Sequence, residues 1–128
     1  MALLARSHSA PAPVWREGLG EHACIVEVRG VLSWGTAAEL LEAVDAARRE
    51  GRTEFVLDLS AVTGVDSLAT MTLRALPERL ELCDVVVAAE AQDAVVAIAQ
   101  AAIHDDWPLR PTRAEALALL LSRPILAG

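Results

Sequence analysis

The most informative stretch of this sequence is Phe55-Val56-Leu57-Asp58-Leu59-Ser60-Ala61-Val62-Thr63-Gly64-Val65-Asp66-Ser67. Its first five residues are almost continuously apolar, which is typical of a central strand that helices cover on at least one face. We expect Ser60 to Val65 to form a loop and Asp66 to open a helix. The apolar residues of that helix recur at helical spacing, at Leu68, Met71, Ala75 and Leu76.

The residues before this stretch predict two strands and a helix. We expect a short strand at Val14 to Glu17 and a longer one at His22 to Arg29, where alternating apolar residues mark one covered face. Thr36-Ala37-Ala38-Glu39 is a capping box, in which the Thr hydroxyl and the Glu carboxylate satisfy free backbone amides at the start of a helix. Gly51 stands where a left-handed residue would end that helix.

The residues after the stretch continue the alternation of helices and strands. Pro77 predicts either a kink or the first turn of a second helix. Val85 to Ala88 has the apolar character of a short buried strand, and Ala91 to Ile103 has helical spacing. We expect a last short strand at Trp107 to Arg110, and a second capping box at Thr112 to Glu115 to start the final helix.

This order of elements predicts an α/β fold with a mixed sheet of four or five strands and about four helices. We expect one domain over residues 14–124, behind a flexible N-terminal tail at residues 1–13. The helices that begin at Thr36 and Asp66 should pack against one face of the sheet. The side chains expected in the core are Leu40, Leu41, Val44, Leu57, Leu68 and Met71.

Charge and composition exclude several classes of function. A net charge of −7 disfavours binding to nucleic acid or to an anionic membrane, because phosphate contacts need a cluster of Lys and Arg. No apolar run approaches the roughly 18 residues of a membrane span. Cys24 and Cys83 lack the spacing of a zinc site, so we expect reduced, buried thiols in a cytoplasmic protein.

The sequence also argues against an enzyme. Ser67 does not lie in a Gly-x-Ser-x-Gly elbow, and a serine nucleophile needs a base within reach. His8, His22 and His104 are each explained as solvated or structural residues. His104-Asp105-Asp106 is a poor metal site, because adjacent loop residues rarely converge on one ion. We therefore expect no catalytic residue, no metal and no cofactor.

Two stretches resemble a known family. The run from Leu57 to Ser67 resembles the strand, loop and Asp-Ser signature of the STAS domain, the fold of anti-sigma factor antagonists and stressosome scaffold proteins. Gly30-Val31-Leu32 resembles a second landmark of the family, the Gly-x-Leu before the first helix. The resemblance spans about Val14 to Arg123. It implies phosphorylation-controlled binding to a kinase-like anti-sigma factor or a stressosome-type kinase, and it leaves open whether the chain forms a homo-oligomer.

The match departs from the family at the phosphorylation site. Anti-sigma factor antagonists typically read Asp-Ser-Ser-Gly and are phosphorylated on the second Ser, whereas this chain has Leu68 at that position. Ser33 replaces an acidic residue that is common after the Gly-x-Leu. Stressosome-type members carry the acceptor directly after the Asp, and by that comparison Ser67 is the phosphorylation candidate.

The resemblance places the partner-binding surface around the start of the helix after Asp66, the preceding loop and the turn at Ser33 to Gly35. The candidate residues are Ser33, Trp34, Thr63, Asp66, Ser67 and Leu68. Two alternatives remain open at this point: Asp66 and Ser67 could serve only as a helix cap, and Trp34 could fill the core instead of anchoring a partner. The protein could also be a constitutive scaffold or an accessory subunit, for example of a lipid-transport ATPase, without phosphorylation.

Overall fold

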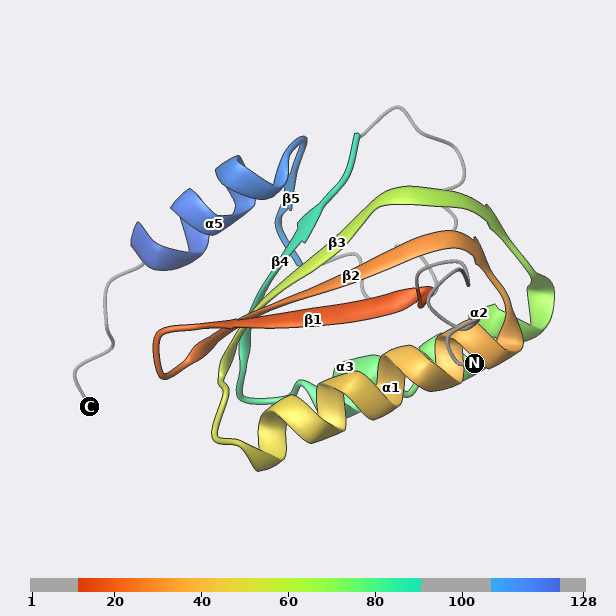
Figure 1. The fold of residues 1–128 in the computed structure, drawn as a ribbon, viewed down its shortest axis with the longest axis horizontal. Helices are drawn as coiled ribbons and strands as arrows, with labels where there is room; N and C mark the ends of the chain where they lie inside the picture. The colour runs from red at the N-terminus through yellow and green to blue at the C-terminus, as the bar shows by residue number, and fades with distance from the viewer. Residues whose placement is uncertain (1–11, 91–106, 123–128) are drawn as a thin grey trace, which may run out of the picture.

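The computed structural model describes residues 12–90 and 107–122 and places them in one mixed sheet with helices on both faces (Figure 1). The strands lie side by side in the order of their labels, with β1 antiparallel to β2 and the other neighbours parallel. The α/β class and the mixed sheet of five strands are as the sequence predicts. The elements are β1 (Val14–Leu19), β2 (Ala23–Leu32), α1 (Trp34–Arg49), β3 (Glu54–Val65), α2 (Ser67–Leu73), α3 (Leu76–Arg79), β4 (Asp84–Ala88), β5 (Leu109–Arg110) and α5 (Arg113–Ser122).

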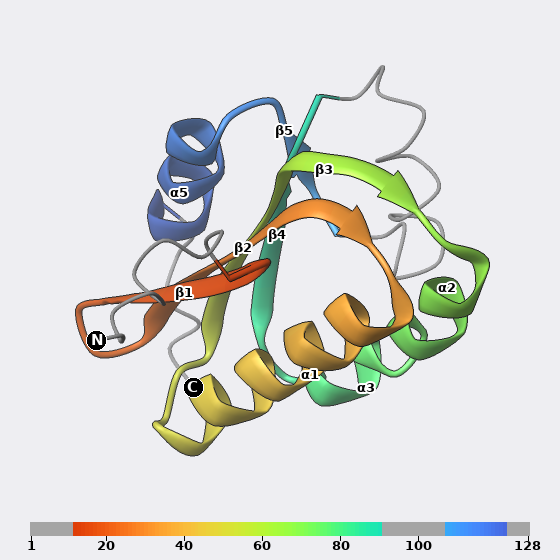
Figure 2. The same ribbon diagram turned by 45° about the vertical axis from the view of Figure 1, so that its right-hand side comes forward.

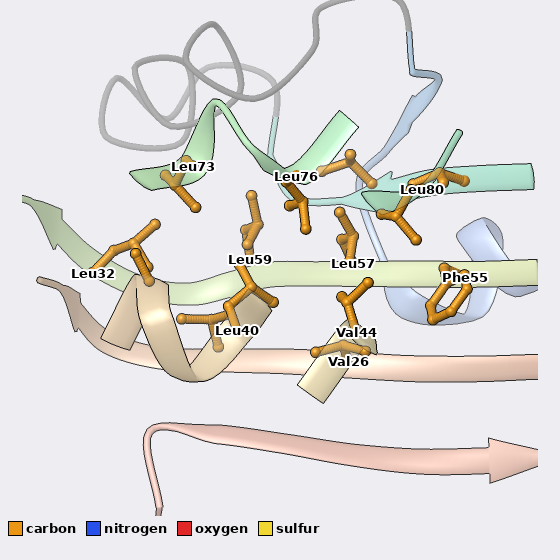
Figure 3. Close-up of a cluster of buried hydrophobic side chains, with 14 of the residues drawn as sticks. Val26, Leu32, Leu40, Val44, Phe55, Leu57, Leu59, Leu73, Leu76 and Leu80 are labelled. Carbon is orange, nitrogen blue, oxygen red and sulfur yellow. The ribbon is translucent and has the colours of Figure 1, made fainter. Parts of the chain in front are cut away.

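The main core lies between the sheet and the helices α1, α2 and α3, which cover one face as predicted for the first two (Figure 2). Alternate residues of β2 and β3 point into this layer, since successive side chains of a strand point to opposite faces. Figure 3 shows these side chains packed together in one layer. The labelled, fully or nearly fully buried members are Val26, Leu32, Leu40, Val44, Phe55, Leu57, Leu59, Leu73, Leu76 and Leu80.

A smaller core lies on the opposite face, under α5. Its buried members are Ile25, Val56, Val86, Ala88, Ala116 and Leu120. This second layer corrects the prediction that the strand after His22 is covered on one face only. Glu27, which alternates with the apolar residues of this strand, is only 7% exposed, and Arg113 of α5 contacts it.

Helix α1 begins earlier than the Thr36 capping box predicts. Ser33 is the N-cap, and its hydroxyl oxygen accepts a hydrogen bond from the Thr36 backbone amide at 3.2 Å. Thr36 is therefore inside the first turn, where it is 7% exposed. The predicted end is confirmed, because Gly51 adopts a φ of 92°, a left-handed conformation that glycine adopts without a steric cost.

Strand β3 continues through the segment that the sequence assigned to a loop. Its pairing with β2 persists to Leu32 opposite Val65, with two shifts in register along the way. Ser60, Thr63 and Gly64 are residues typical of turns, but here they belong to bulges in a continuous strand. The loop prediction for Ser60 to Val65 is wrong for this reason.

Helix α2 is rotated relative to the prediction. Leu68 and Met71 are 58% and 67% exposed, whereas Ala69 and Leu73 are fully buried. The apolar spacing predicts the helix, but two of the apolar residues, Leu68 and Met71, face solvent. The expected burial of Leu68 and Met71 is therefore wrong.

The remaining elements mostly follow the prediction. Pro77 lies in the first turn of the short helix α3, so the second of the two readings is correct. The backbone amide of Glu115 donates to the Thr112 hydroxyl at 3.1 Å, which confirms that cap of α5. The expected helix at Ala91 to Ile103, and residues 1–11 of the expected tail, lie outside the described residues. In the described part of the chain, no helix is both long and apolar enough to cross a membrane.

Candidate functional site

Two helices begin side by side at one end of the molecule. The parallel strands β2 and β3 end together, with Leu32 opposite Val65, and each strand leads through a single capping residue into a helix. The backbone amide of Asp66 donates to the carbonyl of Leu32 at 3.1 Å, which ties the two connections together. The N-termini of α1 and α2 therefore lie next to each other (Figure 2).

The α1 connection is capped by paired hydroxyl groups. Besides accepting from the Thr36 amide, the Ser33 hydroxyl lies 3.1 Å from the Thr36 hydroxyl oxygen, and either group can be the donor. Trp34, the first residue of α1, is 61% exposed. The structure thus excludes the alternative in which Trp34 fills the core.

The α2 connection is capped by a carboxylate. Asp66 Oδ1 accepts hydrogen bonds from the backbone amides of Leu68 at 2.7 Å and Ala69 at 3.3 Å, so Asp66 is a helix cap as predicted. Ser67 is exposed, and its carbonyl oxygen accepts a hydrogen bond from the Thr70 hydroxyl at 2.7 Å. The Ser67 side chain is therefore accessible to another protein.

Thr63 occupies the second irregularity of β3. Gly30 pairs with Val62 and Val31 pairs with Gly64, so Thr63 is the additional residue of a bulge. Gly30 itself has a φ of 77°, in the left-handed region. Bulges bend a strand and re-aim its side chains, and they are frequent beside functional sites. Thr63 is exposed here, shortly before the Asp66 cap.

Exposed apolar side chains gather at this end of the molecule. Seven large apolar side chains are exposed in the described residues, and four of them lie at the carboxyl end of β2, at the start of α1 or in the short helix α2. We call these four the end surface: Val31, Trp34, Leu68 and Met71, which are 56%, 61%, 58% and 67% exposed. Such gatherings mark interaction sites more often than isolated apolar residues do.

All six candidates from the sequence lie at this end, on or beside the two helix N-termini. Val31 and Met71 were missed as surface residues. A signal for Met71 was available, because Leu68 and Met71 are three residues apart in a helix capped by Asp66, and that spacing puts them near one face. Ser33 itself could have indicated the start of α1, because serine is one of the preferred N-cap residues.

The two cysteines lie away from the end surface, and their surroundings make the thiols less reactive. Both are free, and burial raises the pKa of the Cys24 and Cys83 thiols, which disfavours the reactive thiolate. In residues 12–90 and 107–122, no group of three or more His, Cys, Asp or Glu side chains is placed to hold a metal ion.

A comparison with protein families identifies the family of this domain. Residues 15–111 match the family model described as "Mlab, STAS domain". The chain belongs to the STAS family. The Asp66-Ser67 pair and the two adjacent helix N-termini thus lie within the matched part of this STAS domain. A comparison with curated proteins found no match.

Solved structures of similar fold include two anti-sigma factor antagonists. The one from Mycobacterium paratuberculosis is 26% identical, with a TM-score of 0.68, and the match covers 85% of this chain and 93% of that one. SpoIIAA in its unphosphorylated form is 13% identical, with a TM-score of 0.66 and coverage of 86% and 99%. A SpoIIAA-like protein from Shewanella loihica is 14% identical, with a TM-score of 0.60 and coverage of 84% and 91%.

Proposed function

We propose that this STAS domain is a regulatory module that works by binding a protein partner and not by catalysis. The observation that carries the proposal is the end surface, in which Trp34, Leu68 and two further apolar side chains are exposed around two capped helix N-termini. The likeness to an anti-sigma factor antagonist, 26% identical, supports the same role. His22 lies before the amino end of β2, at the opposite end of that strand from the site, so it is not a base for Ser67.

The proposed partner is a kinase-like anti-sigma factor or a stressosome-type kinase in the cytoplasm. Trp34 is the proposed anchor, because large aromatic side chains in the centre of an interface contribute most to binding energy. The net charge of −7 favours a partner whose facing surface carries basic residues around an apolar centre. The same charge argues against nucleic acid as the partner.

Ser67 is the proposed phosphorylation site, and its modification should weaken binding. Asp66 Oδ1 already occupies the amides of Leu68 and Ala69, so a phosphate on Ser67 would remain at the surface. It would add about −1.5 to −2 charges beside the Asp66 carboxylate. A partner pressed against this surface would have to desolvate that charge, which costs free energy.

The test combines phosphorylation with a binding titration. The purified protein is incubated with ATP and the kinase-like ATPase encoded nearest to its gene, and intact mass is measured. That ATPase is then titrated with unmodified protein, phosphorylated protein and the Ser67→Asp variant. We expect one phosphate on Ser67, weaker binding after phosphorylation, and a smaller loss for Ser67→Asp because aspartate carries less charge.

The control is Ser122→Asp, which adds the same charge to an exposed serine on α5, on the other face of the sheet. It should bind like the unmodified protein. Equal affinity of all forms would refute the switch. A lowered melting temperature after phosphorylation would instead show that Ser67 serves only the fold.

A second candidate is a constitutive accessory subunit, for example of a lipid-transport ATPase. The observation in its favour is Leu68, which puts an exposed apolar side chain where anti-sigma factor antagonists typically carry the phosphorylated Ser. An apolar contact at that position needs no phosphate to regulate it. Binding to a transporter ATPase that is unaffected by Ser67→Asp would support this candidate over the switch.

A further inference from the structure

Two acidic side chains are buried on the α5 side of the sheet. Glu27 of β2 and Asp58 of β3 are paired in register, and they are only 7% and 2% exposed. Burying a carboxylate is unfavourable unless it is paired and hydrogen-bonded. The groups that compensate these two charges therefore matter for the shape of the sheet at this point.

Arg113, from α5, binds both carboxylates. Its Nη2 lies 2.9 Å from Asp58 Oδ2 and 3.0 Å from Glu27 Oε2, and its Nε donates to the same Asp58 oxygen at 2.9 Å. The guanidinium also lies over the Trp15 ring of β1, 5.6 Å from its centre. Burial alone would lower the pKa of Arg113, but the hydrogen bond and charge of Asp58, together with Glu27, raise it. Arg113 thus ties α5 to three strands.

The other oxygen of Asp58 holds a bulge in β3. Asp58 Oδ1 accepts from the backbone amide of Ser60 at 3.0 Å and from its hydroxyl at 2.5 Å. Glu27 pairs with Asp58 and Arg29 pairs with Ala61, so β3 uses one more residue than β2 over this interval. This bulge begins at the residue that Arg113 holds. It precedes the part of β3 that curves toward α2 (Figure 2).

We propose that Arg113 is a positioning residue for the partner-binding end, acting from the opposite face of the sheet. By fixing the Asp58 carboxylate through Oδ2, it sets the orientation in which Oδ1 holds Ser60. The bulge at Ser60 then sets the path of β3 through Thr63 to the Asp66 cap. The contacts run from α5 through Asp58 to Ser60, and the backbone of β3 continues from there to the site. The effect on binding rests on the proposed function.

The first test needs no partner, because the Ser60 amide bonds to Asp58 and reports directly on the bulge. Hydrogen exchange is compared between Arg113→Gln and a matched control, Leu120→Ala, which weakens the packing of α5 without touching Asp58. We expect Arg113→Gln to speed exchange at Ser60 by roughly tenfold, the effect of losing about one hydrogen bond. Leu120→Ala should speed exchange in α5 and leave Ser60 near the wild-type rate.

A second variant covers the case in which Arg113→Gln does not fold. Asp58→Asn keeps the side-chain volume and removes the ion pair between Arg113 and residue 58. The contact between Arg113 and Glu27 stays, so α5 remains attached to the sheet. Exchange at Ser60 should again rise. Unchanged exchange at Ser60 in the folded variants, or an equal rise in Leu120→Ala, would overturn the positioning role.

The partner titration separates this inference from the proposed function. Arg113→Gln should bind the kinase-like ATPase several-fold more weakly than Leu120→Ala does, because only the first alters the path of β3. Faster exchange at Ser60 together with equal affinities of the two variants would contradict the link to the site. Failure of the wild-type protein to bind would count against the proposed function alone, since the exchange result stands without a partner.

Discussion

Leu82 combines two unfavourable features in one residue. Its backbone has a φ of 72°, in the left-handed region, and its side chain is 95% exposed in the turn between α3 and β4. A non-glycine residue in this region costs about 1–2 kcal/mol, and glycine avoids that cost. Strain of this kind is local, so a single substitution can measure it.

The prediction for this residue is that Leu82→Gly is more stable than Leu82→Ala. Both variants remove the exposed apolar side chain, but only glycine removes the steric strain. Glycine loses more conformational entropy on folding than alanine does, and this loss offsets part of the gain. The net difference in the free energy of unfolding should be about 0.5–1 kcal/mol. Urea denaturation of the two variants measures it, and an equal or lower stability of Leu82→Gly would contradict the assigned backbone conformation.

We expect the Cys24 thiol to make the free energy of unfolding depend on pH in the alkaline range. Burial raises its pKa above the ordinary value of 9.0, so the folded state holds the proton more tightly than the unfolded state does. The stabilisation that follows from this higher pKa is fully present below the pKa of Cys24 in the unfolded chain. It is lost as the pH rises above that value. The free energy that Cys24→Ala costs should therefore shrink between about pH 8 and pH 10. Val26→Ala, a neighbouring buried change without a thiol, should show a constant cost; a parallel decline in both would remove the thiol as the cause.

At the scale of single elements, the periodicity of the sequence predicted which segments are helices and strands better than where they begin or which side they bury. Helix α2 shows why. The spacing of its apolar residues identifies a helix. Which side of α2 faces the core depends on the position of its Asp66 cap and on its packing against α1, and these are set by the tertiary structure. Strand β3 shows a second limit, because Ser60 and Thr63 are typical of turns and a bulge uses the same residue types.

The start of α1 gives a direct test at this scale. Ser33→Ala removes the acceptor for the Thr36 amide and should cost about 0.5–2 kcal/mol of stability. Ser33→Asp restores an acceptor and adds a negative charge at a helix N-terminus, so it should remain within about 0.5 kcal/mol of the wild type. Chemical denaturation compares them, and Ser33→Ala matching Ser33→Asp would mean that the cap contributes nothing.

At the scale of the whole molecule, the sheet separates two helical layers. One face buries the main core under α1, α2 and α3, and these elements bring the two helix N-termini together. The other face carries α5 and the buried ion cluster around Arg113. The family was predictable from the Asp66-Ser67 signature, whereas the ion cluster was not. Its members Glu27, Asp58 and Arg113 are far apart in the sequence and meet only in the folded sheet.

The central claim, that the protein binds its partner through the end surface, can be tested most directly by photo-crosslinking in cells. A benzophenone amino acid is placed at Trp34 or Leu68, and at Leu82 or Leu121 as controls that are at least as exposed. Adducts are identified by mass spectrometry. We expect the Trp34 and Leu68 positions to crosslink to one and the same kinase-like protein and the control positions not to do so. Adducts with that protein only from Leu82 or Leu121, or none from Trp34 and Leu68, would contradict it.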